Sequence, residues 1–200
     1  MAEATSAVDR IREERIVAVL RRTRDVDAVV DALLRGGIRV VEITLDSPDA
    51  LATIERLRRK PDVAVLAGTV RTAAQADAAV EAGAQACVAP ALVPAMIARC
   101  RALGVPAIPG TLTPSEVEAA RGLGAELVKL FPAGLLGPGY VRDVLAPLSD
   151  VPLLATGGVD LTNAREFLDA GAVAVGVGSA LTGSDDVAAA ARRLVDAVRA

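Results

Sequence analysis

Short apolar runs rich in β-branched residues alternate with longer stretches rich in alanine and arginine along the chain. The apolar runs predict eight buried strands: Ile16–Arg21, Val40–Leu45, Val63–Ala67, Ala86–Ala89, Pro106–Ile108, Leu127–Phe131, Leu153–Thr156 and Val173–Val177. The stretches between them predict helices over 25–35, 48–59, 72–82, 92–103, 114–122, 139–147 and 161–170, and a last helix fits 185–199.

Glycine and threonine mark the ends of these predicted helices. Glycines at 36–37, 83, 104, 122, 124 and 171 follow helical stretches, as glycine does at helix C-caps. Thr72, Thr113 and Thr162 stand where N-caps are expected.

Strands and helices that alternate with such short connections favour right-handed βαβ units and a parallel sheet. Eight strands in 200 residues leave about 25 residues for each unit, which predicts a compact (β/α)8 TIM barrel. We expect a single domain over residues 1–200, with an N-terminal helical extension over about residues 1–15. A doubly wound open sheet is the alternative, but the first strand-to-helix junction, VAVLRRTRDVD, lacks the glycine fingerprint of that fold.

The composition supports a covered sheet and narrows the chemistry. Hydrophobic residues make up 52% of the chain and aromatics only 2%, so the core must consist of small and branched aliphatic side chains. There is no histidine, which excludes Ser-His-Asp triads and imidazole zinc sites. Cys87 and Cys100 match no metal-ligand spacing, so we expect reduced thiols in the core and no metal site.

The charge pattern also limits the partners. The net charge is −3 and there is no basic stripe, so nucleic acid is not an expected partner. The polar N-terminus resembles neither a signal peptide nor an anchor, and no apolar run approaches the roughly 20 residues of a membrane helix. We therefore expect a soluble, cytoplasmic protein without membrane contact.

Lys129 interrupts the apolar strand ELVKLFP and is one of only two lysines, the other being Lys60 at a solvated helix end. Because strand side chains alternate, Lys129 shares a face with Leu127 and Phe131. A charged lysine there costs free energy unless it is paired or loses its proton. A neutral amine is a nucleophile for carbonyl carbon. The alternative is a lysine whose ammonium group reaches solvent at a strand end.

Glu42 is the candidate partner of Lys129. It shares a face of the second strand with Val40 and Thr44. Strands two and six face each other across an eight-stranded barrel, and alternate strands contribute to the same interior layer. Glu42 and Lys129 are therefore expected to meet inside the barrel, as an acid–base and nucleophile pair or as a buried structural ion pair.

Glycine turns follow the last two strands and predict a phosphate site. Gly157 and Gly158 follow the seventh strand, and Gly178 and Ser179 follow the eighth. Backbone N–H groups at such turns can bind an anion, and we expect the helix starting near Leu161 to add its positive end.

Three further residues at strand ends are candidates for substrate contact. Arg21 could bind a substrate carboxylate, or it could be an exposed surface residue with no role in binding. Thr69 could bind substrate or cap a helix, and Pro90 follows the fourth strand.

The chain resembles the 2-keto-3-deoxy-6-phosphogluconate (KDPG) and 4-hydroxy-2-oxoglutarate (KHG) aldolase family. The motifs that carry the resemblance run in family order from about Ile16 to Leu181: IVAVLR, GGIRVVEITLDSPDA, AGTV, APAL, IPGTLTPSE, LVKLFPA, GPGYV, ATGGV and GVGSAL. The combination is specific, although no single motif is.

The resemblance implies a class I aldolase that needs no metal or other cofactor and that is usually a homotrimer. Lys129 would be the Schiff-base lysine and Glu42 the carboxylate that moves protons. Thr69 and Pro90 would line the pyruvate pocket, with Phe131 beside the lysine. The four phosphate-site residues named above would hold the substrate phosphate.

Two positions bear on the substrate. Some members have arginine directly after the EITL-like strand, where it holds the substrate carboxylate, whereas this chain has Asp46. Arg21 is then the expected carboxylate partner. Thr156 is the residue type associated with the gluconate-derived epimer, and valine with the galactonate epimer.

Two other functions stay open at this point. A barrel transferase related to thiamine-phosphate synthase would need Mg²⁺ and an acidic cluster, which the sequence does not suggest. A trimeric scaffold with an inactive site is the non-enzymatic alternative, and the retention of both Lys129 and Glu42 argues against it.

Overall fold

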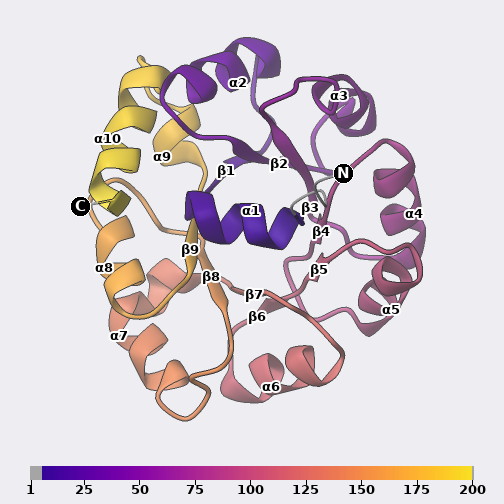
Figure 1. Ribbon diagram of the computed structural model, residues 1–200, viewed down its shortest axis with the longest axis vertical. Coiled ribbons are helices and arrows are strands. Elements are labelled where there is room, and N and C mark those ends of the chain that lie inside the picture. The colour runs from indigo at the N-terminus through magenta and orange to yellow at the C-terminus, as the bar shows by residue number, and fades with distance from the viewer. Residues whose placement is uncertain (1–5, 200) are drawn as a thin grey trace, which may run out of the picture.

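The computed structural model describes residues 6–199, and its strands form a closed parallel barrel (Figure 1). The strands are β1 (Ile16–Leu20), β2 (Val40–Thr44), β3 (Ala64–Gly68), β4 (Cys87–Val88), β5 (Ala107–Ile108), β6 (Gly110–Thr111), β7 (Val128–Leu130), β8 (Leu153–Thr156) and β9 (Ala174–Val177). Their order is β5-β4-β3-β2-β1-β9-β8-β7-β6, and every pair is parallel.

Within residues 6–199 the structure has nine strands, but they occupy only eight positions around the barrel, here called staves. Pro109 accounts for the difference, because it divides one of the eight into two short strands. It lies between β5 and β6, which are the two ends of the sheet order, so both are parts of the fifth stave. Proline has no N–H to donate, but its carbonyl still accepts a hydrogen bond from the Lys129 N–H at 2.9 Å. The (β/α)8 prediction is confirmed. The predicted end of the fifth strand at Ile108 is wrong, because the chain continues past the proline to Thr111.

The helices surround the barrel as an outer ring (Figure 1). They are α2 (Val26–Arg35), α3 (Ala50–Leu57), α4 (Ala73–Glu81), α5 (Pro94–Ala102), α6 (Pro114–Gly122), α7 (Ala133–Leu145), α8 (Ala164–Asp169), α9 (Ser179–Thr182) and α10 (Val187–Arg199). None of the helices within residues 6–199 is long and apolar enough to cross a membrane.

Two helix boundaries differ from the prediction, and one short helix was not predicted. Helix α7 begins at Ala133, and Gly137, at φ 76° and ψ 175°, kinks it, so the range 139–147 covers only its second part. Helix α8 begins at Ala164 after Asn163, so Thr162 is not its N-cap. The short helix α9 was not predicted. Thr72 and Thr113 do cap α4 and α6, each accepting a backbone N–H three residues on.

The core has two parts, separated by the barrel wall. One lies between the wall and the helices and contains Val41, Val128 and Phe167. The other lies inside the barrel and contains Val17, Val40, Leu66, Val88, Ile108, Leu127 and Leu154. Because Val40 and Leu127 point inward, Glu42 and Lys129, two residues further along their strands, point inward as well.

Helix α1 (Ala7–Glu14) closes the end of the barrel where the strands begin. It lies across the barrel in Figure 1, and it buries Val8 and Ile11 completely against the interior residues. Ser6 caps the helix by accepting the Asp9 N–H at 3.1 Å. Of the expected extension over residues 1–15, residues 1–5 lie outside the described part of the chain.

We predict that Ile11→Ala lowers the free energy of unfolding by about 2–5 kcal/mol, because it leaves a cavity beneath the barrel interior. Urea denaturation measures the change. Glu13→Ala is the matched control, since Glu13 is exposed on the same helix and should shift stability by less than about 0.5 kcal/mol. Equal losses in both variants would show that α1 is not an integral part of the core.

Candidate active site

A cavity of about 630 Å³ opens at the end of the barrel where the strands finish. Every residue predicted for the site except Glu42 lines it: Lys129, Arg21, Thr69, Pro90, Phe131, Thr156, Gly157, Gly158, Gly178 and Ser179. The cavity is also lined by residues that were not predicted for the site, among them Arg71, Asp160, Gly176 and Ala180. Strand parity could have indicated Gly176, which faces inward from β9.

Lys129 and Glu42 lie together below this cavity, inside the barrel. Their side chains are 6% and 1% exposed, and the Lys129 Nζ is 3.9 Å from the Glu42 Oε1. That distance allows an ion pair but is too long for a direct hydrogen bond. A proton passing between the two groups therefore needs an intervening water or substrate atom.

The Glu42 carboxylate has no hydrogen-bond partner among the described residues, although both of its oxygens are buried. Leaving buried polar atoms without partners is costly, so such groups commonly belong to functional sites that a ligand or water completes. Gly68 provides the space for this carboxylate, because a Cβ atom there would lie 2.1 Å from the Glu42 Oε1. The Thr156 hydroxyl is likewise buried and unpartnered beside Gly176, where a Cβ atom would be 2.4 Å away.

Phe131 follows β7 and brings its ring near the amine. The Lys129 Nζ lies 5.1 Å from the ring centroid, within the range of a cation–π contact. The ring also packs against Gly157, where a side chain would meet it at 2.8 Å. The lysine is therefore enclosed by one carboxylate and one aromatic ring.

Arg21 and Thr69 form the opposite rim of the cavity. The Arg21 Nη2 donates to the Thr69 hydroxyl at 3.1 Å, and its Nη1 donates to the Asp46 carboxylate at 2.9 Å. Thr69 has φ 59°, a left-handed conformation that is strained for a β-branched residue. Strained backbone conformations of this kind persist only where the surrounding structure holds them, and they are most frequent at functional sites.

The two glycine turns lie around the same cavity, as predicted. The helix whose N-terminus faces that cavity is not the one that was predicted. Gly157 and Gly158 have φ values of 86° and 76°, which favour glycine. The Asp160 carboxylate accepts the N–H groups of Thr162 and Asn163, so the turn near Leu161 cannot offer them to an anion. Hydrogen bonds from the Thr162 hydroxyl and these N–H groups hold the pKa of Asp160 below its ordinary value.

Helix α9 supplies the free N–H groups instead. Ser179 and Ala180 form its first turn and line the cavity, and first-turn N–H groups have no acceptor within their own helix. The backbone groups placed to meet an anion in this cavity are therefore those of the turn after β8 and the start of α9.

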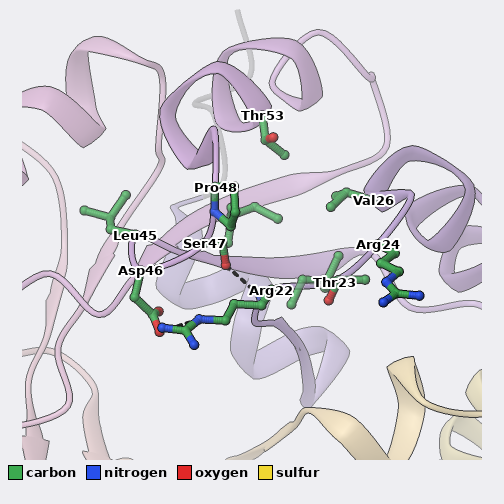
Figure 2. A pocket seen from close by; sticks show the side chains of 11 residues that line it. Arg22, Thr23, Arg24, Val26, Leu45, Asp46, Ser47, Pro48 and Thr53 are labelled. Atoms are coloured by element: carbon green, nitrogen blue, oxygen red, sulfur yellow. Dashed lines mark hydrogen bonds and ion pairs between the residues drawn. The ribbon is translucent and has the colours of Figure 1, made fainter.

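A second cavity, of about 700 Å³, lies beside the barrel between the loops that follow β1 and β2 (Figure 2). Arg22, Thr23, Arg24, Asp46 and Ser47 are among its lining residues. It contains neither Lys129 nor the glycine turns. Within residues 6–199, no three His, Cys, Asp or Glu side chains gather in a way that could hold a metal ion.

Comparison with known proteins connects this geometry with a family. Residues 8–197 match the family described as KDPG and KHG aldolase. The chain belongs to this family.

Individual relatives agree with this assignment. The 2-dehydro-3-deoxy-phosphogluconate aldolase of Treponema pallidum (strain Nichols) is 40% identical over 164 residues, which cover 81% of this chain and 78% of the relative. A probable 2-dehydro-3-deoxy-6-phosphogalactonate aldolase of Rhizobium meliloti (strain 1021) is 35% identical over 174 residues, covering 84% and 82%.

A solved structure adds chemical context. KDPG aldolase from Legionella pneumophila, described with pyruvate captured as a covalent carbinolamine intermediate, matches with a TM-score of 0.82 and 26% identity over 95% of each chain. The family predicted from the motifs is confirmed. The protein is an aldolase, an enzyme of the lyase class, and its relatives include enzymes named for both the gluconate and the galactonate epimers.

We predict that Gly68→Ala displaces the Glu42 carboxylate, because the new methyl group would overlap its Oε1. Aldol cleavage should slow by roughly 10²–10⁴-fold, the usual effect of losing an acid–base group, while the fold is kept. Steady-state kinetics measures the loss, and Glu42→Gln should show a comparable one.

Gly122→Ala is the matched control for this substitution. Gly122 lies in α6 with nothing within 4 Å of an added Cβ, so cleavage should be unchanged. If the Gly68→Ala variant cleaved substrate at the wild-type rate, the position that we assign to the carboxylate would be wrong.

Proposed function

We propose that this aldolase cleaves 2-keto-3-deoxy-6-phosphogluconate to pyruvate and glyceraldehyde 3-phosphate through a Schiff base on Lys129. The observation that carries the proposal is the buried amine beside an unpartnered buried carboxylate, at the base of a cavity wide enough for a sugar acid. A purely structural ion pair would not leave both carboxylate oxygens without hydrogen bonds.

The reaction begins at the ketone. The Lys129 amine, after its proton has passed to Glu42, attacks C2 of the substrate. The resulting carbinolamine takes that proton back from Glu42 as it loses water, which gives an iminium ion. The iminium ion withdraws electrons from C3 and prepares the C3–C4 bond for cleavage. Phe131 covers the amine and limits the access of water to this intermediate.

Glu42 performs the proton transfers. Through a bridging water, its carboxylate accepts the C4 hydroxyl proton while the C3–C4 bond breaks and glyceraldehyde 3-phosphate leaves. The electron pair of that bond remains on the pyruvyl fragment as an enamine. The enamine then takes a proton at C3, and hydrolysis of the iminium releases pyruvate and the free lysine.

The remaining cavity residues bind the two ends of the substrate. Arg21 and Thr69 hold the carboxylate, and Pro90 forms the apolar wall of the pyruvate pocket. The phosphate lies against the backbone N–H groups of Gly157, Gly158, Gly178 and Ser179. Thr156 contacts the hydroxyl groups and favours the gluconate epimer.

We also infer an assembly and a location for the protein. The family resemblance supports a homotrimer, for which light scattering should give three times the 20.4 kDa of one chain. The two free, buried thiols of Cys87 and Cys100 fit a reducing cytoplasm.

We predict that borohydride reduction with pyruvate adds a three-carbon unit to the peptide containing Lys129. Peptide mass mapping locates the adduct. Lys129→Ala should abolish both the adduct and cleavage, because the nucleophile is gone. Lys60→Ala is the control, since Lys60 pairs with Asp31 outside the barrel and should not affect labelling. Labelling that persists in Lys129→Ala would refute the assignment, and any cleavage by the wild-type protein would exclude an inactive scaffold.

We predict a second result for the phosphate. Substrates without it should lose kcat/KM, while the pyruvate adduct on Lys129 still forms, because binding at the remote end helps to orient the reacting bond. Gly158→Val should give the same selective loss, since Gly158 has φ 76° and lies against Gly134. Equal efficiency with both substrate types would favour a related aldolase that acts on 4-hydroxy-2-oxoglutarate.

A further inference from the structure

Asp46 is the second residue after β2, and its carboxylate lies between two arginines. Its Oδ2 is 2.9 Å from the Arg21 Nη1 and 3.9 Å from the Arg22 Nε. Figure 2 shows Asp46 and Arg22 pointing toward each other at the edge of the second cavity. Arg21 lines the catalytic cavity. Asp46 therefore pairs with one arginine from each cavity.

The guanidinium group of Arg21 is held at two points. Asp46 accepts from one terminal nitrogen and Thr69 from the other, and these two residues follow different strands. An arginine has five N–H groups in one plane, so two anchors fix the plane and leave three N–H groups for a ligand. A half-exposed arginine without such anchors would sample many rotamers.

The backbone around Arg21 is held as well. The Arg22 N–H donates to the Ser47 hydroxyl at 2.8 Å, and the Ser47 hydroxyl lies 3.0 Å from that of Thr44. Arg22 has φ 50°, so the chain turns sharply there. The loop after β1 is thus tied to the loop after β2 beside the Arg21–Asp46 ion pair.

The charges on this rim still favour an anion. Asp46 carries one negative charge between two guanidinium groups, so the group of three keeps a net positive charge. Burial alone would raise the pKa of Asp46, but the Thr44 hydroxyl and the charges of Arg21 and Arg22 together lower it below its ordinary value. Asp46 therefore stays ionised at neutral pH, and the ion pair persists under assay conditions.

We propose that Asp46 is a positioning residue, which together with Thr69 orients the Arg21 guanidinium to bind the carboxylate of a 2-oxo acid beside Lys129. This inference rests on the proposed function, because it assumes that Lys129 receives such an acid. Asp46 does not touch the substrate. It acts by ordering Arg21 before binding, so the substrate does not have to fix that side chain.

The test measures the pyruvate concentration that gives half-maximal borohydride trapping on Lys129. Asp46→Ala should raise it roughly two- to tenfold, the loss expected when one side chain must be ordered on binding. Asp46→Asn should recover part of the loss, because its amide oxygen can still accept from Arg21. Asp49→Asn is the matched control: Asp49 belongs to the same loop and makes no side-chain cap hydrogen bond.

A double-mutant cycle shows whether Asp46 acts through Arg21. In an Arg21→Ala background, Asp46→Ala should cause no further loss, whereas independent roles would give additive losses. Methyl pyruvate supplies a second readout, because it has the ketone without the charged carboxylate. Its half-saturation should be the same in wild type and Asp46→Ala.

The outcomes separate the two proposals. Suppose that wild type traps pyruvate on Lys129 but Asp46→Ala binds pyruvate equally well, or that the losses from Asp46→Ala and Arg21→Ala are additive. The positioning role of Asp46 is then wrong, and the aldolase proposal stands. If wild type traps no pyruvate, both are overturned. Should Asp46→Ala fold poorly in circular dichroism, Asp46→Asn in the same cycle decides the question.

Discussion

The burial of a lysine and a glutamate at the centre of an apolar barrel is the constraint on which the other features depend. Both side chains are almost fully buried, and the Glu42 carboxylate makes no hydrogen bond within the described residues. The surrounding structure must therefore both provide space for the pair and hold it in place. Gly68 provides the space, and the layer of Val40, Leu66 and Leu127 provides the rigid floor.

The small side chains of this protein follow from the same constraint. A barrel of eight staves has an interior that side chains normally fill. Here glycines stand at several interior positions near the strand ends. Gly176 and Gly178 line the cavity, and Gly68 makes room for the Glu42 carboxylate. The near absence of aromatic residues is consistent with an interior that large rings would have blocked, and Phe131 is placed where its ring covers the amine.

Much of this arrangement could be predicted from the sequence because it depends on local periodicity. Strand parity placed Glu42 and Lys129 inside the barrel, and the strand count placed them on opposite staves. The features that sequence analysis missed depend on contacts between distant segments. The strand beyond Pro109 continues because its neighbour supplies a donor, and the N–H groups near Leu161 are occupied by Asp160. The ion pair of Asp46 with Arg21 joins two loops that are 25 residues apart, which no periodic pattern reveals.

The helix that closes the other end of the barrel has a kinetic consequence. Because α1 fills that opening with Val8 and Ile11, a molecule bound at the lysine faces solvent through the cavity at the opposite end of the barrel. Of two fragments formed there, the one nearer the mouth must depart before the one attached deeper inside. In the proposed Schiff-base reaction the oxo acid also stays bonded to Lys129 until hydrolysis, so the aldehyde leaves first and the oxo acid second. The oxo acid in excess should then act as a competitive product inhibitor of the enzyme.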